Sequence, residues 1–290
     1  MIELNKIYLE DCLVTMKRMP DDFIDLIIAD PPYHKIVDDE FDHQHETENE
    51  FIEWQKQWIS EAIRILKPTG TIYIFGSIKN NALLKIKLWL DEKMIYRNWI
   101  TWHKNTRMQS GKNNFVNQRE EILYYTKSNN FYFENPRGVQ YESMNSAKEY
   151  AAFLLKEKPP YNRGAIDKLN EYYGRIAKER NWNRGNTEIY YDWRGKNLGN
   201  VFLNISLDQN QNGNDSKQHT AQKPEPLIDK LILASSKENE LIYSPFAGSG
   251  TDCVCASRLR RKFIGSEIEK KHIDYAEKRL HPHTSKTFLF

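Results

Sequence analysis

The chain has 290 residues, of which 39% are hydrophobic and 28% charged, and its formal net charge is +2. This length suits one large α/β domain with an inserted region, and the composition supports a packed core rather than wholesale disorder. A net charge this small excludes a uniformly basic chain, so contact with nucleic acid would have to come from a local basic surface.

The sequence carries no signature of a membrane protein, a disulfide framework or a metal site. No stretch approaches the ~18 apolar residues that cross a bilayer, and the first residues lack the order of a signal peptide, so we expect a cytoplasmic protein without membrane contact. Cys12, Cys253 and Cys255 are odd in number and indicate buried thiols. His43 and His45 lack a third partner, and we expect no bound metal.

The first third of the chain alternates predicted strands and helices. Residues 25–30 form a short apolar run that ends at two prolines, which predicts a buried strand. Thr47 and Glu50 form a capping box that starts a helix continuing to Leu66. Further elements are expected as a strand at 71–75, a helix at 80–92 and strands at 95–102 and 121–126, with 131–133 pairing with the last. This alternation predicts a parallel sheet covered by helices.

From about residue 135 to 217 the buried-strand pattern is lost. This stretch is rich in Asn, Arg, Lys and Tyr, and we expect an inserted, partly helical region. Its basic and aromatic residues suit a DNA surface, whereas the interleaved acidic residues would also suit a solvated surface. Alternation then returns, with a helix expected at 226–236, a strand at 241–244, a helix at 251–260, a strand at 263–266 and a helix at 270–280.

A cluster of hydrogen-bond acceptors follows the first predicted strand. It consists of Asp30, Pro31, Pro32 and Tyr33. The prolines remove two backbone donors and fix φ, so the carboxylate and nearby carbonyls can converge on an amino group. Tyr33 offers a ring face to a planar base. A plain proline turn at a strand end is the alternative interpretation.

A glycine turn lies between the strand at 241–244 and the next helix. It consists of Phe246, Ala247, Gly248, Ser249, Gly250 and Thr251. The helix N-terminus presents free N–H groups to a ligand, but neither the lysine of a phosphate-binding loop nor G-x-G-x-x-G spacing is present. The following strand ends at Glu267, about 20 residues after the turn, which is the offset from which an acid reaches ribose hydroxyls. A cofactor with a ribose and no pyrophosphate fits both features, although Glu267 could also be a plain surface acid.

A polar linker joins the inserted region to the next helix. It contains Thr220, Gln222 and Lys223, followed by Pro224. Alone it is merely a linker with a helix start, but its closeness in sequence to the glycine turn makes it a candidate wall of the same pocket.

These three motifs, in this order, resemble the β-class amino-methyltransferases of DNA, and most of all their N6-adenine members from restriction-modification systems. The likeness covers nearly the whole chain outside the inserted region. It implies the class I methyltransferase fold, a Rossmann-like, doubly wound, mostly parallel α/β sheet. It also implies a permuted order, with a catalytic half at 1–134, an inserted target-recognition region at 135–217 and a cofactor-binding half at 218–290.

The resemblance implies S-adenosyl-L-methionine as the cofactor and duplex DNA as the partner. The catalytic residues would be those of the acceptor cluster, acting on the amino group of a flipped-out base. The cofactor would be held by the glycine turn and Glu267, with Asp30, Thr220, Gln222 and Lys223 nearby and with Asp11 and Cys12 close to its adenine. The family usually has Asp where this chain has Ser244. An acid there would face the methionine amino group, so we expect weaker cofactor binding or a transfer of that role to Asp30 or Ser244.

Several alternatives stay open at this point. Asp at position 30 favours adenine N6, but cytosine N4 methylation needs the same acceptor geometry. Methylation of RNA, or a DNA-binding regulator that has lost turnover, would also fit these motifs. The sequence determines neither the recognition sequence, nor whether the chain forms a homodimer, nor whether it works with a cognate restriction endonuclease.

Overall fold

The computed structural model describes residues 2–33, 46–77, 81–104, 119–134, 201–202 and 222–284. Contacts within the chain divide it into two compact units, one made of 1–134 and 199–290 and the other of 135–198. The second unit lies outside the described residues, as do the histidines at 34, 43 and 45. The predicted division into catalytic, target-recognition and cofactor-binding parts therefore stays a prediction.

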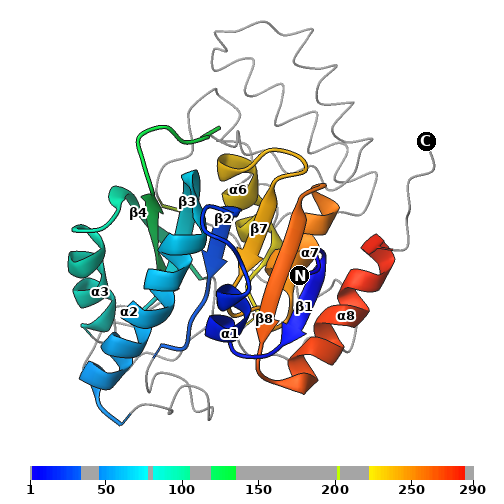
Figure 1. Cartoon of the computed structure of the whole chain (residues 1–290), viewed down its shortest axis with the longest axis horizontal. Helices are drawn as coiled ribbons and strands as arrows, with labels where there is room; N and C mark the ends of the chain where they lie inside the picture. Colours follow the sequence, from blue (N-terminus) through cyan, green and yellow to red (C-terminus); the bar gives the residue numbers. More distant parts are fainter. Residues whose placement is uncertain are drawn as a thin grey trace, which may run out of the picture. The chain divides into compact units, whose positions relative to one another are not determined.

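The described residues form an eight-stranded sheet in the order β1-β8-β7-β2-β3-β5-β4-β6 (Figure 1). From β1 to β3 all neighbours are parallel, whereas β5 runs antiparallel to both β3 and β4. The strands are β1 (Lys6–Leu9), β2 (Ile24–Ala29), β3 (Leu66–Gly76), β4 (Ile95–His103), β5 (Arg119–Thr126), β6 (Val201–Phe202), β7 (Leu241–Ser244) and β8 (Lys262–Glu267). This is the mostly parallel α/β sheet that the sequence predicted.

Two groups of helices accompany the sheet (Figure 1). The helices are α1 (Cys12–Lys17), α2 (Glu48–Ile65), α3 (Ala82–Leu90), α6 (Glu225–Ser235), α7 (Thr251–Arg258) and α8 (Lys270–Thr284). α2 packs against both α1 and α3, whereas α7 packs against both α6 and α8. None of the helices in the described ranges has the length and hydrophobicity that a membrane-spanning segment requires.

The burial of β2 explains why its sequence is a continuous apolar run. Ile27 and Ala29 belong to the core shared with α1, α2 and α3, and Leu26 and Ile28 are fully buried outside that core. A strand covered on both faces has no polar side to display, which is typical of a central parallel strand. The run ends where Pro31 cannot continue the ladder.

Most predicted elements are confirmed within a few residues, and the capping box of α2 is present with both of its hydrogen bonds. The predicted strand at 131–133 is wrong, since those residues lie in no strand. The structure adds β1 and α1, which the sequence analysis did not predict. Both elements are short, and β1 has only one buried residue, Ile7, so its apolar pattern is weak. It also places Val201–Phe202 in the sheet, parallel to β4, within the region predicted to be inserted.

Candidate active site

The acceptor cluster and the glycine turn lie at the same edge of the sheet. β2 and β7 are parallel neighbours, with Leu26 opposite Ile242 and Ile27 opposite Tyr243. Both strands therefore end side by side, and each is followed by one of the two motifs. The carboxyl edge of a parallel sheet is where α/β proteins bind their ligands.

The Asp30 carboxylate has two neighbours that hold it in place. Lys223 Nζ lies 2.5 Å from Oδ2, and the Tyr33 hydroxyl donates to Oδ1 at 2.6 Å. The Asp30 side chain is 21% exposed, whereas that of Lys223 is only 9% exposed. The structure thus joins Asp30 and Tyr33 to one residue of the polar linker, Lys223. Thr220 of the same linker lies outside the described residues.

A second carboxylate, which the sequence analysis did not identify, completes this cluster. Glu120, near the start of β5, forms an ion pair with Lys223 Nζ at 3.3 Å and a second ion pair with Lys104. Its side chain is 10% exposed. The antiparallel pairing of Gly76 with Glu121 brings the beginning of β5 to the carboxyl end of β3. The sequence predicted this strand but not its direction, so Glu120 had no visible link to the site.

Burial and charge shift the protonation of these groups. Burial raises the pKa of Asp30 above its ordinary value, against the opposing effect of Lys223, and the negative charge of Glu120 adds to the rise. Burial would also raise the pKa of Glu120, but Lys223 and Lys104 together bring it below its ordinary value. Burial would lower the pKa of Lys223, yet the two carboxylates raise it. Lys223 is therefore an ammonium shared between two acids.

A pocket adjoins the acceptor cluster. It is open to solvent and lies between the end of β3 and the helices α2 and α3. Its lining includes Pro31, Pro32, Tyr33, Phe75, Gly76 and Ser77. The site therefore offers a largely apolar recess next to the Asp30 carboxylate.

The glycine turn has the backbone conformation that its sequence requires. Gly248 and Gly250 have φ values of 50° and 73°, a left-handed region that favours glycine. A Cβ on Gly250 would come within 2.6 Å of the Cβ of Ala276 in α8, so glycine is needed there for packing as well. Gly250 is also the N-cap of α7. The turn consequently lies close against α8.

Glu267 connects the turn to the neighbouring strand. Its Oε2 accepts the backbone N–H of Gly248 and its Oε1 that of Glu269, each at 2.8 Å. Burial would raise the pKa of Glu267, but hydrogen bonds from His272 and these backbone groups bring it below its ordinary value. A carboxylate that stays ionised beside a glycine turn is suited to accept hydrogen bonds from hydroxyl groups.

Ser244, the departure from the family pattern, has an acidic partner. Its Oγ donates to Oδ2 of Asp252 at 2.8 Å, and both residues are buried. Asp252 lies in the first turn of α7 and is electrostatically coupled to both Asp30 and Lys223. Burial raises the pKa of Asp252 to about 7. A carboxyl group therefore does lie at the end of β7, but it belongs to Asp252 of α7 and not to the strand residue at position 244.

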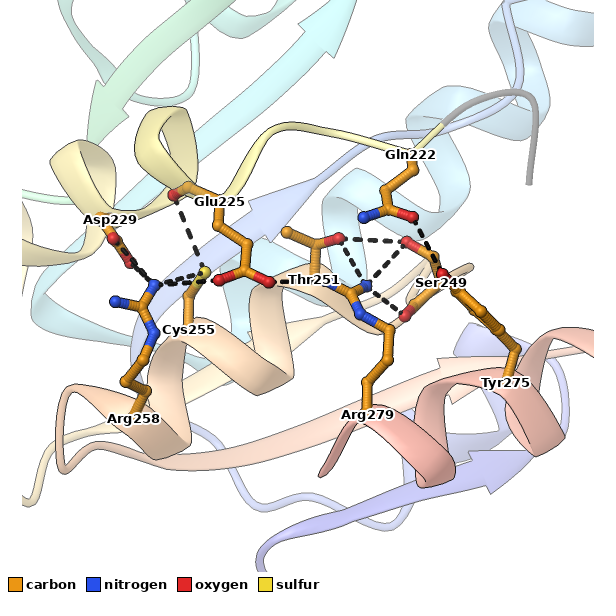
Figure 2. A network of polar contacts seen from close by, with 9 residues as sticks. All are labelled: Gln222, Glu225, Asp229, Ser249, Thr251, Cys255, Arg258, Tyr275 and Arg279. Atoms are coloured by element: carbon orange, nitrogen blue, oxygen red, sulfur yellow. Dashed lines mark hydrogen bonds and ion pairs between the residues drawn. The ribbon is translucent and has the colours of Figure 1, made fainter. Parts of the chain in front are cut away.

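Arg279 of α8 fixes the glycine turn from outside, as Figure 2 shows. Its Nη1 donates to the Ser249 carbonyl at 2.7 Å and to Thr251 Oγ1 at 2.9 Å, and its Nη2 donates to Glu225 at 2.9 Å. Glu225 also pairs with Arg258, which binds both oxygens of Asp229. In the same figure the Tyr275 hydroxyl donates to Gln222 at 3.4 Å. This network, which the sequence analysis missed, ties α6, α7 and α8 around the turn.

The remaining predicted residues, Asp11 and Cys12, lie just beyond β1. Leu9 is opposite Glu267 in the parallel pair of β1 and β8, so the two strand ends are neighbours. Asp11 is exposed and caps α1 by accepting the N–H of Leu13 at 2.7 Å, whereas Cys12 is 3% exposed. Burial raises the pKa of the Cys12 thiol, so it is an inert buried group. Their closeness to a cofactor stays a prediction.

Comparison with known proteins agrees with this arrangement. A model of the family N6_N4_Mtase, described as DNA methylase, matches residues 24–278. The type II methyltransferase M1.MboII of Moraxella bovis is 31% identical over 283 residues, which cover 95% of this chain and 96% of that protein.

Solved structures show the same fold. The M1.HpyAVI-SAM complex has 22% identity and a TM-score of 0.58, covering 95% of this chain and 98% of that one. PvuII DNA methyltransferase (cytosine-N4-specific) has 15% identity and a TM-score of 0.65, covering 97% and 90%. Because the family model and a relative of similar length both match nearly the whole chain, the protein belongs to the N6/N4 family of DNA methylases.

Proposed function

We propose that this DNA methyltransferase transfers a methyl group from S-adenosylmethionine to N6 of adenine in duplex DNA, at a base flipped out of the helix. The observation that carries this proposal is the Asp30 carboxylate, which lies beside the glycine turn at the edge shared by β2 and β7. The relative M1.MboII is described as a type II methyltransferase, which supports a place in a restriction-modification system.

The residues at this edge fit the cofactor. Glu267 is partly buried and keeps its charge at neutral pH, so its oxygens can accept the hydroxyl groups of a ribose. The turn at 248–251 leads into the N-terminus of α7, whose free N–H groups suit a ligand, and Asp252 adds a buried carboxyl group that can stabilise a cationic ligand. When bound, S-adenosylmethionine supplies an electrophilic methyl group for direct transfer to an amine.

Asp30 would activate the amine of the target base. The lone pair of an exocyclic amine is delocalised into the ring, which makes it a poor nucleophile. We expect the Asp30 carboxylate and the Pro31 carbonyl to accept its two N–H groups and to direct the lone pair away from the ring plane. Because burial raises the pKa of Asp30, this carboxylate is also suited to take the proton that the amine loses.

Tyr33 and the adjoining pocket would receive the flipped base. Flipping costs roughly a few kcal/mol of stacking and pairing. Stacking on an aromatic ring offsets part of this cost, and Tyr33 lines the pocket together with Pro31 and Pro32. The target-recognition role of residues 135–217 completes the proposal, with duplex DNA as the substrate.

The test is to express the wild type and the Asp30→Ala variant in a host free of DNA methylation. Nucleoside mass spectrometry should find N6-methyladenine with the wild type and none with Asp30→Ala, and long-read sequencing should map it to one recognition sequence. N4-methylcytosine would replace the adenine assignment with the cytosine alternative. If the wild type modified neither base and released no S-adenosylhomocysteine, the chain would be a binding protein without turnover.

A competition assay separates DNA from RNA as the substrate. Purified enzyme with tritiated S-adenosylmethionine should label genomic DNA from the same host, even with structured RNA in excess. Preferential labelling of the RNA would contradict the proposal. The Asp30→Ala variant must still bind S-adenosylmethionine in a calorimetric titration, which shows that loss of labelling does not come from loss of the fold.

A further inference from the structure

We propose that Glu120 is a positioning residue, which holds the Lys223 ammonium while the Asp30 carboxylate is engaged with the amine of the target base. This inference rests on the proposed function, in which Asp30 accepts that amine. Glu120 of β5 is then a second carboxylate of the site, and Lys223 moves from Asp30 to Glu120 when the base binds.

In the structure the Asp30 carboxylate is already engaged. Lys223 Nζ lies 2.5 Å from one oxygen, and the Tyr33 hydroxyl donates to the other at 2.6 Å. The Lys223 ammonium also lies over the Tyr33 ring, 5.6 Å from its centroid. Under the proposed function, the flipped base stacks on this same Tyr33 ring. A bound base therefore requires Lys223 to withdraw both from the carboxylate and from the ring.

Lys223 cannot simply be exposed to solvent when it withdraws. Its side chain is 9% exposed, and a buried ammonium without an anion is strongly unfavourable. Among the described residues, its ion pairs are those with Asp30 and Glu120. Its Nζ is already 3.3 Å from Glu120 Oε2, so a short side-chain movement completes that pair. The direction of withdrawal is therefore towards β5.

Glu120 has the negative charge that is needed to pair with the Lys223 ammonium. It is ionised, because Lys223 and Lys104 bring its pKa below the ordinary value, and its ion pair with Lys104 orients the carboxylate. The Tyr33 hydroxyl lies 3.5 Å from the same Oε2 and 2.6 Å from Asp30. Tyr33 could thus keep its hydrogen bond to Asp30 or shift towards Glu120 together with the lysine.

The experiment compares three variants by methylation of genomic DNA from a methylation-free host with tritiated S-adenosylmethionine. Glu120→Gln keeps the shape and removes the charge, whereas Glu120→Asp keeps the charge and shortens the side chain. Glu121→Gln is the matched control, because Glu121 is the next residue in β5, is buried and contacts Trp99, Thr101 and Arg119 instead. Calorimetric titration with S-adenosylmethionine reports whether each variant is folded.

We expect Glu120→Gln to lower kcat at least tenfold, with cofactor affinity within about twofold of the wild type. Glu120→Asp should retain more activity than Glu120→Gln, although Gln is the closer isostere, because the role depends on charge. The acid limb of kcat/KM should also move to lower pH in Glu120→Gln, since the charge of Glu120 raises the pKa of Asp30. Glu121→Gln should leave this limb in place.

The inference fails if Glu120→Gln is as active as Glu121→Gln, or if Glu120→Gln is more active than Glu120→Asp. The second order would indicate that position 120 needs a side-chain shape rather than a charge. Failure of the proposed function gives a different result, since Asp30→Ala would then methylate DNA normally. An inactive Asp30→Ala with a fully active Glu120→Gln would reject only the role of Glu120.

Discussion

Asp252→Asn replaces a buried carboxyl group with a neutral amide of the same shape. In the folded protein, burial raises the pKa of Asp252 from 3.8 to about 7. Ser244 and the cations Lys223 and Arg279 oppose this rise, and the negative charge of Asp30 adds to it. The ionised form of Asp252 is therefore destabilising, whereas Asn can still accept the hydrogen bond of Ser244 Oγ.

The sign of the pH dependence follows from proton binding. Between about pH 4 and pH 7 the folded state holds a proton on Asp252 that the unfolded state has lost, so stability falls as pH rises through this window. One pKa unit corresponds to about 1.4 kcal/mol, so a difference of about three units between the folded and unfolded states changes the free energy of unfolding by roughly 4 kcal/mol in total. We expect the stability advantage of Asp252→Asn to grow by about 2–3 kcal/mol between pH 5 and pH 8 and then to level off.

Urea unfolding of both proteins at pH 5, 6.5 and 8 measures this difference, because every other titrating group is shared and largely cancels. Circular dichroism and tryptophan fluorescence should give the same midpoints if unfolding is two-state. A difference that is constant with pH, or that shrinks as pH rises, would show that Asp252 is ionised in the folded protein at all of these pH values.

Three further predictions concern the cofactor edge. Glu267→Gln should lower the affinity for S-adenosylmethionine by roughly tenfold or more, because a neutral amide is a weaker acceptor for hydroxyl groups; unchanged affinity in calorimetry would place the ribose elsewhere. Gly250→Ala should cost at least ~1–2 kcal/mol in urea unfolding, since φ is 73° and the new Cβ would meet Ala276; a neutral change would show that the turn can relax. Arg279→Met should weaken cofactor binding by roughly tenfold through loss of its bonds to the turn. Arg258→Met, whose partners are Glu225, Asp229 and Cys255 and not the turn, should reduce stability and spare binding. Equal effects of the two arginine variants on binding would contradict a specific role for Arg279.

The order of strands and helices could be predicted from the sequence because each element carries its own local signal. The apolar run of β2 and the capping box of α2 depend on neighbours a few residues away. The glycine turn is equally local, since left-handed backbone at 248 and 250 requires glycine wherever the turn is placed. The acceptor cluster and the turn also follow predicted strands, and the sequence therefore indicated that both would lie at the carboxyl edge of a parallel sheet.

The tertiary structure decided which distant side chains meet. Lys223 reaches Asp30 across 193 residues, and Tyr33 lies near Glu120 across 87 residues. The contact with Glu120 depends on the antiparallel direction of β5. The apolar pattern of a strand does not encode its direction in the sheet, because the same pattern fits a parallel or an antiparallel strand. The carboxyl group of Asp252 takes the place beside Ser244 only because the first turn of α7 folds back over the end of β7. Motifs and their order are properties of the chain, whereas the charges that share a buried site are set by packing.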